Sequence, residues 1–247
     1  MPRLRRLLLL GGLTFLLGVI VFFPARVAYE WFAPVAVRVA GIEGTVWRGG
    51  AAEARIEGLY LRNLTWAFRP AALFRGRIGF AVAAEPASGF VEGIVGFTAG
   101  GTMHLADVTG SMPLELLRES VGSPGLSGGL SLRVENLEVR DGRPVAGQAT
   151  FQVADVREPR IDGGSLGGYR GVVTTAEQGL VVHYEDTDGV IDVEGRIDLA
   201  SDGSFRHSAR LRPKPATPAR IRQFIGSLPP AADGSDWREA VLGEGYL

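Results

Sequence analysis

Apolar residues recur at every second position along much of the chain, and this alternation predicts β-strands with one apolar and one polar face. The clearest stretch has apolar residues at Leu180, Val182, Tyr184, Ile191, Val193, Ile197, Leu199, Phe205, Ala209 and Leu211. Two Asp-Gly pairs, Asp188-Gly189 and Asp202-Gly203, interrupt it. Such pairs accept the positive φ that hairpin turns require, so the stretch is predicted to be a β-meander.

A second meander is predicted between residues 130 and 153. Its first strand reads Leu130, Leu132, Val134, Leu137 and Val139, a turn follows at residues 141–144, and the chain returns through residues 145–153. The apolar phase slips by one residue around Asn136, and we expect a β-bulge there to keep both halves on the same face.

Shorter strands are predicted at residues 56–60, 64–68 and 78–82, and in pieces between Val91 and Leu105. A helical period appears at residues 218–228, where Ile221, Phe224, Ile225 and Leu228 share a face. Thr217 is the expected N-cap of this helix and Pro218 its first residue. A shorter helical turn is predicted at residues 113–118.

The N-terminal segment is predicted to be a transmembrane anchor at residues 7–25. These 19 residues carry no charge, and at 1.5 Å rise per residue they just cover a hydrocarbon core of about 30 Å. Arg3, Arg5 and Arg6 precede them, so the positive-inside rule places residues 1–6 in the cytoplasm and residues 26–247 on the other side of the membrane. The alternative is a cleaved signal peptide, but the exit at residues 22–28 fits a cleavage site poorly.

The fold class predicted is therefore all-β: a mainly antiparallel, long, curved or groove-like meander sheet, with one N-terminal transmembrane helix and a short C-terminal helix. No linker divides residues 35–211, which favours one domain over two. An apolar sheet face has to be covered. The sheet would curl into a groove or half-barrel, pack as a sandwich, or use a partner.

Composition excludes several functions. The 247 residues hold 26 basic and 27 acidic side chains without long runs of either sign, so nucleic acid is not an expected partner. All the basic residues but Lys214 are arginine, and Lys214 was assigned no role. The absence of cysteine rules out thiolate catalysis and cysteine-based zinc sites.

No catalytic, cofactor-binding or metal-binding residues are predicted, and no cofactor is expected. His104, His183 and His207 lie in separate predicted strands and are interpreted as polar-face residues. The acidic residues Glu185, Asp186 and Asp188 belong to a predicted hairpin tip, where solvated carboxylates are usual. The glycine pairs at residues 49–50, 128–129 and 163–164 precede no convincing helix, so they are interpreted as turns.

One ordered set of short motifs is more informative about function than the residues discussed so far. It begins with Gly41-Ile42-Glu43-Gly44-Thr45-Val46-Trp47-Arg48-Gly49, after the Phe23-Pro24-Ala25 exit, and continues through residues 61–70, 73–76, 199–205, 211–213 and 245–247. In order and spacing it resembles the general secretion pathway protein N (GspN) family of the bacterial type II secretion system. The resemblance covers nearly the whole chain, although each motif alone is short.

That resemblance implies a non-enzymatic inner-membrane component of the type II secretion system that acts through periplasmic protein contacts. The implied partners are the other inner-membrane components and the outer-membrane secretin, with the lipid bilayer held through the anchor. The alternative hypothesis is an envelope lipid-binding or lipid-transfer protein, because long one-faced sheets on membrane anchors also resemble AsmA-like lipid carriers with an apolar β groove. An enzyme is the third reading.

Overall fold

The computed structural model describes residues 2–33, 37–56, 59–86, 88–117, 125–158 and 165–246, with side chains from residue 7 onward. Its elements are α1 (Pro2–Val21), α2 (Ala25–Phe32), β1 (Val37–Gly44), β2 (Arg48–Ile56), β3 (Leu59–Phe68), η1 (Pro70–Arg75), β4 (Arg77–Pro86), β5 (Phe90–Thr98), β6 (Met103–Pro113), η2 (Leu114–Leu117), β7 (Ser127–Arg140), β8 (Arg143–Arg157), β9 (Ser165–Ala176), β10 (Gly179–Asp186), β11 (Ile191–Ala200), β12 (Ser204–Pro213), α4 (Ala219–Ser227) and β13 (Arg238–Tyr246).

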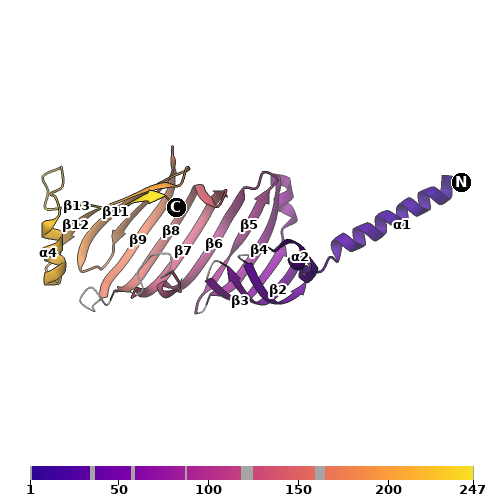
Figure 1. Ribbon diagram of the computed structural model, residues 1–247, viewed down its shortest axis with the longest axis horizontal. Helices are drawn as coiled ribbons and strands as arrows, with labels where there is room; N and C mark the ends of the chain where they lie inside the picture. The colour runs from indigo at the N-terminus through magenta and orange to yellow at the C-terminus, as the bar shows by residue number, and fades with distance from the viewer. Residues whose placement is uncertain are drawn as a thin grey trace.

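The 13 strands form one antiparallel sheet in which spatial order follows chain order from β1 to β13 (Figure 1). At about 4.8 Å between neighbours, the sheet is about 58 Å wide from edge to edge. Contacts run almost entirely between consecutive strands. The prediction of one long antiparallel sheet is thus confirmed, and the sandwich alternative is wrong because all the strands among the described residues belong to this one sheet.

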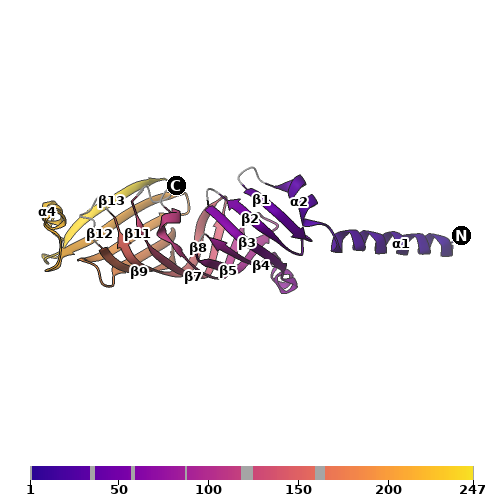
Figure 2. The same ribbon diagram turned by 90° about the horizontal axis from the view of Figure 1, so that it is seen from below.

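A single layer leaves much of its surface in solvent. The chain exposes 15791 Å², whereas a compact globular protein of its 26.3 kDa exposes roughly 10,600 Å². Seen from below, the sheet is strongly curved, with β1 and β13 above the level of β7 (Figure 2). The expected curvature is therefore present, but the sheet stays open.

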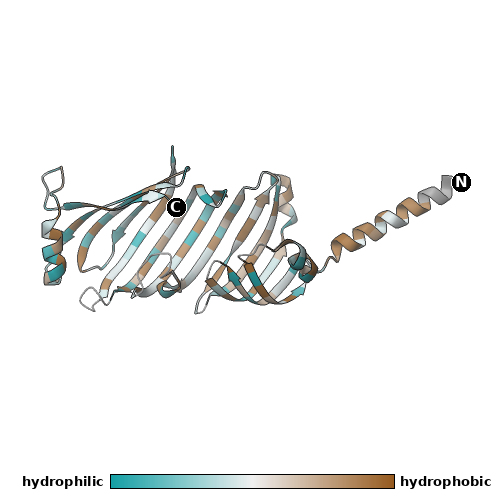
Figure 3. Cartoon of the chain, viewed as in Figure 1, coloured by the Kyte–Doolittle hydropathy of each residue, from teal (hydrophilic) through white to brown (hydrophobic). Residues whose placement is uncertain are grey.

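Hydrophobic and hydrophilic residues alternate along many of the strands (Figure 3). The strand registers therefore sort the side chains into one apolar and one polar face, as the alternation predicted. Large side chains on the apolar face lie over glycines of the next strand. A Cβ on Gly171 would overlap the Phe151 ring, and one on Gly195 would overlap the Tyr184 ring. Glycine at these positions leaves room for each ring to lie flat on the sheet.

Two small cores lie at the two ends of the sheet, each on its apolar face. One gathers Ala54, Leu61 and Ala84 near the N-terminal edge. The other gathers Val193, Ala209 and Leu211 beneath Ile225 of α4. The helical period is confirmed in part: Ile225 is buried against β11 and β12 with Ile221 and Leu228 partly buried beside it, whereas Phe224 of the predicted stripe is exposed.

The helix cap was predicted wrongly. The N-cap of α4 is Pro218, and the Thr217 hydroxyl instead accepts a hydrogen bond from the Lys214 N–H and donates one to the Val190 carbonyl. Thr217 joins two loops because the Val190 carbonyl lies within reach of its side chain, while Pro218 supplies the extended conformation that precedes the helix. The shorter predicted turn is the 3₁₀ helix η2, and Arg118 lies outside the described residues.

Several strand boundaries also differ from the prediction. The strand predicted at 56–60 is wrong: Ile56 ends β2 and Leu59 begins β3, the two strands pair antiparallel with Tyr60 opposite Arg55, and residues 57–58 lie outside the described ranges. The irregularity expected at Asn136 is confirmed by a register shift between Val134 and Asn136. Strands β1, β9 and β13 and helix α2 were not predicted, because their short apolar runs are interrupted by glycine, arginine or glutamate.

At the N-terminus, α1 ends at Val21, before the predicted exit at Ala25. Pro24 explains the break, since it lacks an N–H and disfavours helical backbone at the residue before it. The exposed side chains of residues 7–22 are mostly apolar (Figure 3). Within the part of the chain that the structure describes, no helix is both long enough and apolar enough to cross a membrane. The transmembrane anchor stays a prediction.

Candidate interaction surfaces

The first surface is the joint between α1 and the sheet. Trp47 donates its indole N–H to the Ile20 carbonyl at 2.7 Å, and the Val46 N–H donates to the Phe23 carbonyl at 3.0 Å. The Ile20 carbonyl is among the last four of α1, which have no partner within a helix. The tryptophan thus satisfies the end of the helix and fastens it to the sheet.

The glycine-rich motif around residues 41–49 builds this joint. Gly44 has φ 85°. The next residue, Thr45, closes a turn, because its hydroxyl accepts a hydrogen bond from the Arg48 N–H at 3.2 Å. Trp66 donates its indole N–H to the Thr45 carbonyl at 3.1 Å. Its ring occupies the space that a side chain on Gly49 would take. Residues that are short, separate signals in the sequence therefore meet at one place.

An aromatic row continues from the joint into the sheet. The Trp47 and Phe68 ring centroids lie 5.0 Å apart, and those of Phe68 and Phe80 lie 5.7 Å apart. Trp47 and Trp66 are both half-buried. Replacing a fully buried tryptophan by alanine lowers the free energy of unfolding by about 3–5 kcal/mol. Because neither ring is fully buried, we expect Trp47→Ala and Trp66→Ala each to cost less than this.

Replacing Trp47 by Phe is expected to loosen the joint while leaving the sheet folded. The variant keeps the ring stacking but loses one hydrogen bond, at a cost of about 0.5–1.5 kcal/mol. Hydrogen exchange should show faster exchange of the Val46 amide with β8 amides unchanged. Trp237→Phe, at the other end of the chain, is the control. Unchanged protection at Val46 would contradict this account of the joint.

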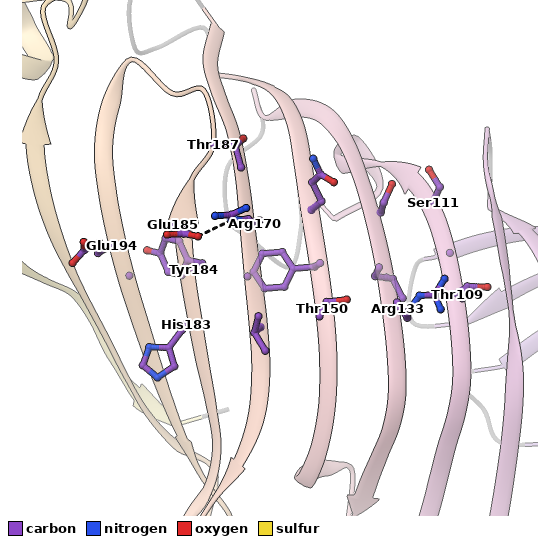
Figure 4. Close-up of a pocket in the computed structure, with 18 of the residues that line it drawn as sticks. Thr109, Ser111, Arg133, Thr150, Arg170, His183, Tyr184, Glu185, Thr187 and Glu194 are labelled. Carbon is purple, nitrogen blue, oxygen red and sulfur yellow. Dashed lines mark hydrogen bonds and ion pairs between the residues drawn. The ribbon is translucent and has the colours of Figure 1, made fainter.

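The second surface is a hollow of about 950 Å³ on the polar face between β5 and β11. Two rows of side chains cross it, one residue per strand (Figure 4). The first row is Ser111, Ser131, Gln152, Arg170, Glu185 and Glu194, and the second is Thr109, Arg133, Thr150, Val172 and His183. On each strand that contributes to both rows, the two side chains are two residues apart, so the rows lie about 7 Å from each other.

The rows carry mixed charge. Arg170 donates to Glu185 at 2.6 Å, and both side chains are more than half exposed. An exposed pair of this kind stabilises the fold by about 0–1 kcal/mol. The hollow is therefore a solvent-exposed polar surface that presents hydroxyl, amide and guanidinium groups. It suits a polar partner, and it differs from the apolar β groove that the lipid-carrier hypothesis expects.

The third surface is the apolar face of the central strands. Neither α2 nor α4 reaches it, since α2 packs on β1 and α4 on β12. Its large side chains are half-buried by one another, and they include Phe80, Val95, Leu105, Leu132, Val134, Phe151 and Val173. Contiguous apolar surface of this kind is unusual on a soluble monomer and is typical of surfaces that bind other molecules.

Lys214, to which the sequence assigned no role, holds the far end together. Its ammonium contacts Asp186 Oδ2 at 2.5 Å, Asp192 Oδ1 at 3.2 Å and the Gly189 carbonyl at 3.1 Å. Hydrogen bonding to Asp186 raises the pKa of Lys214 despite some desolvation. Desolvation opposes the change at Asp192, but hydrogen bonds from Arg212 and Lys214 lower the pKa of that carboxyl overall. The cluster ties the β10–β11 turn to the segment before α4.

The three histidines lie apart in the structure. His104 and His183 belong to the polar face, as predicted, but His207 belongs to the apolar face, so the interpretation of it was wrong. Its Nε2 lies 2.6 Å from the Tyr184 hydroxyl. That hydroxyl compensates for the burial of a polar ring among apolar neighbours. Desolvation lowers the pKa of His207 and raises that of Tyr184 to about 12.

Acidification below pH 6.5 is expected to weaken the C-terminal core through His207. A lowered pKa in the folded state means that the unfolded chain binds the proton first, so stability is lost as pH falls from 6.5 towards the folded pKa. The melting temperature of His207→Gln should fall less between pH 7.5 and 5.5 than that of the parent protein. His183→Gln is the matched control, and an equal fall in all three proteins would contradict the assignment.

No group of three or more His, Asp or Glu side chains that could hold a metal gathers in the described ranges. Gly49–Gly50 lies within β2 and Gly128–Gly129 within β7, whereas Gly163–Gly164 lies outside the described residues. The two described pairs thus belong to strands, and the prediction that they form turns is wrong there.

Comparison with known proteins gives one family. The model of the family described as type II secretion system (T2SS), protein N, matches residues 35–239. A protein named "Type II secretion system protein N" from Vibrio cholerae serotype O1 (strain ATCC 39315 / El Tor Inaba N16961) is 25% identical over 232 residues, covering 90% of each chain. No solved structure matches.

Proposed function

The chain belongs to the type II secretion system protein N family, and from this premise we propose that it is a non-enzymatic inner-membrane component of that system. In this role it serves protein export across the outer membrane through periplasmic contacts with other subunits. The observation that carries the proposal is the open sheet, which offers two broad faces on a layer one strand thick.

The proposed topology follows from the N-terminal segment. Residues 7–25 anchor the chain in the inner membrane, residues 1–6 lie in the cytoplasm, and residues 26–247 lie in the periplasm. Arginines before the apolar stretch and the apolar side chains of α1 support this arrangement. The Trp47 hydrogen bond supports it too, because it ties the end of α1 to the sheet.

The proposed partners are the other inner-membrane components of the secretion system and the outer-membrane secretin. The hollow between β5 and β11 supports protein contacts, since it presents polar groups and exposed ion pairs of the kind found at wet, reversible interfaces. Nucleic acid is not a proposed partner, given the near balance of 26 basic and 27 acidic residues.

Affinity purification of the full chain from cross-linked membranes tests the proposal. We expect known inner-membrane subunits of the secretion system to copurify, and their yield to fall when Arg133 and Arg170, which line the hollow, are replaced by Glu. Replacing Arg55 and Arg62 by Glu on β2 and β3 is the matched control. Recovery of no secretion subunit would contradict the proposal.

A second candidate function is lipid handling in the envelope, favoured by the uncovered apolar face of β4–β10. Acyl chains would cover that face at a gain of about 25 cal/mol per Å² of apolar surface removed from water. Native mass spectrometry of the detergent-extracted chain distinguishes the two. Copurifying phospholipid that is lost on Leu132→Glu favours the carrier, and a lipid-free chain rules against it.

A further inference from the structure

The two edges of the sheet are protected very differently. At β1, the Tyr29 hydroxyl of α2 donates to the Val37 carbonyl at 3.0 Å and accepts the Val39 N–H at 3.1 Å. It thereby occupies two outward-facing backbone groups at the start of β1, and Pro24 bridges to Thr45 just beyond the end of the strand. A covered edge cannot accept another strand, and natural sheets commonly block their edges in this way.

At β13 only the start of the outer edge is covered. The Glu239 N–H donates to the Pro229 carbonyl at 3.0 Å, and Pro230 bridges to Arg238. Beyond that point, Ala240–Tyr246 forms hydrogen bonds to β12 and to no other described residue. These seven residues leave about 23 Å of strand edge with unpaired backbone groups.

Side chains along this edge favour a partner strand with a particular sequence of charged and apolar residues. Glu239 and Glu244 point to the polar face, are exposed and form no ion pair with any described residue. Val241 on the same face is 55% exposed. The apolar face carries only Ala240, Gly243 and Gly245, so an added strand has room there for bulky side chains beside Phe205.

We infer that the free edge of β13, residues 240–246, binds an extended segment of another protein that alternates basic and bulky apolar residues. The segment adds a fourteenth strand whose backbone pairs with residues 240–246 of β13. One basic side chain lies opposite Glu244, and another, opposite Val241, lies diagonal to Glu239. The inference rests on the proposed function, because the segment belongs to a secretion subunit. Since β13 is the edge of the sheet opposite to β1, next to which α2 and α1 lie (Figure 1), this contact is remote from the N-terminal helix.

A photo-cross-linking side chain at Leu242, which is 47% exposed, tests the inference in the full chain in its native membranes. We expect one adduct whose cross-linked peptide alternates basic and bulky apolar residues. Glu239→Lys with Glu244→Lys should lower its yield roughly tenfold, since like charges set opposite each other disfavour strand pairing. Glu135→Lys with Glu177→Lys, an equal charge change at exposed positions elsewhere, should leave the yield unchanged.

An adduct of the chain with itself, an adduct insensitive to the reversal at residues 239 and 244, or no adduct would each overturn the inference. The melting temperatures of both double variants show that they are folded. If secretion depends on the chain and no adduct forms, the edge inference fails while the proposed function holds. If the adduct has the expected pattern but the captured protein lies outside the secretion system, the proposed function fails.

Discussion

Ile225→Ala is expected to destabilise the chain by about 2–5 kcal/mol, the usual cost of truncating a buried aliphatic side chain. Ile225 is 1% exposed, and it packs on Val193, Ala209 and Leu211. Because the sheet is a single layer, few neighbouring side chains can move into the cavity that the substitution leaves. Urea unfolding followed by tryptophan fluorescence measures the loss.

Phe224 on the same helix provides the control. Its side chain is 55% exposed, so Phe224→Ala should change the free energy of unfolding by no more than about 0.5 kcal/mol. Equal losses for the two variants would mean that α4 does not dock through Ile225, and the C-terminal core described above would be wrong.

Lys214→Met is expected to cost about 1.5–3 kcal/mol, because it removes charge-assisted hydrogen bonds and leaves Asp186 and Asp192 without their shared cation. The Asp186 side chain is 10% exposed, so water replaces the lost contact poorly. Arg196→Met removes an exposed pair with Asp198 and should cost about 0–1 kcal/mol.

The stability of Lys214→Met should depend on pH differently from that of the parent protein. Because the pKa of Asp192 is lowered from 3.8 in the folded chain, its contribution is present above about pH 3.8 and is lost as pH falls through the folded value. Without Lys214, that folded pKa rises, so acid unfolding should begin at a higher pH. Parallel acid-unfolding curves for the parent and variant would contradict the role assigned to Lys214.

Much of the sheet was predictable because its chemistry is local. Period-two apolar residues fix strand faces, so the meanders at 130–153 and 180–211 appear in the structure. Gly142 and Gly203 have the positive φ expected of Asp-Gly turns, whereas Gly189 does not. The edges were not predictable in this way. β13 contains Gly243 and Gly245, whose role depends on Phe205 from the neighbouring strand, and that proximity exists only after folding.

The interaction surfaces show the same division. Trp47 and Trp66 are recognisable as parts of short motifs, but their joint needs Ile20, which lies 27 residues before Trp47. The first polar row needs six strands in register and the second needs five, with one residue from each strand. Lys214 is a lone lysine in the sequence, and its two carboxylate partners come from β10 and β11.

The most direct test of the account is secretion by a strain from which the gene is deleted. A protein exported by the type II system should accumulate in the periplasm of that strain, and a plasmid copy of the full chain should return it to the culture medium. Normal secretion by the deletion strain, with the chain shown to be missing, would contradict the claim that this protein works in the secretion system.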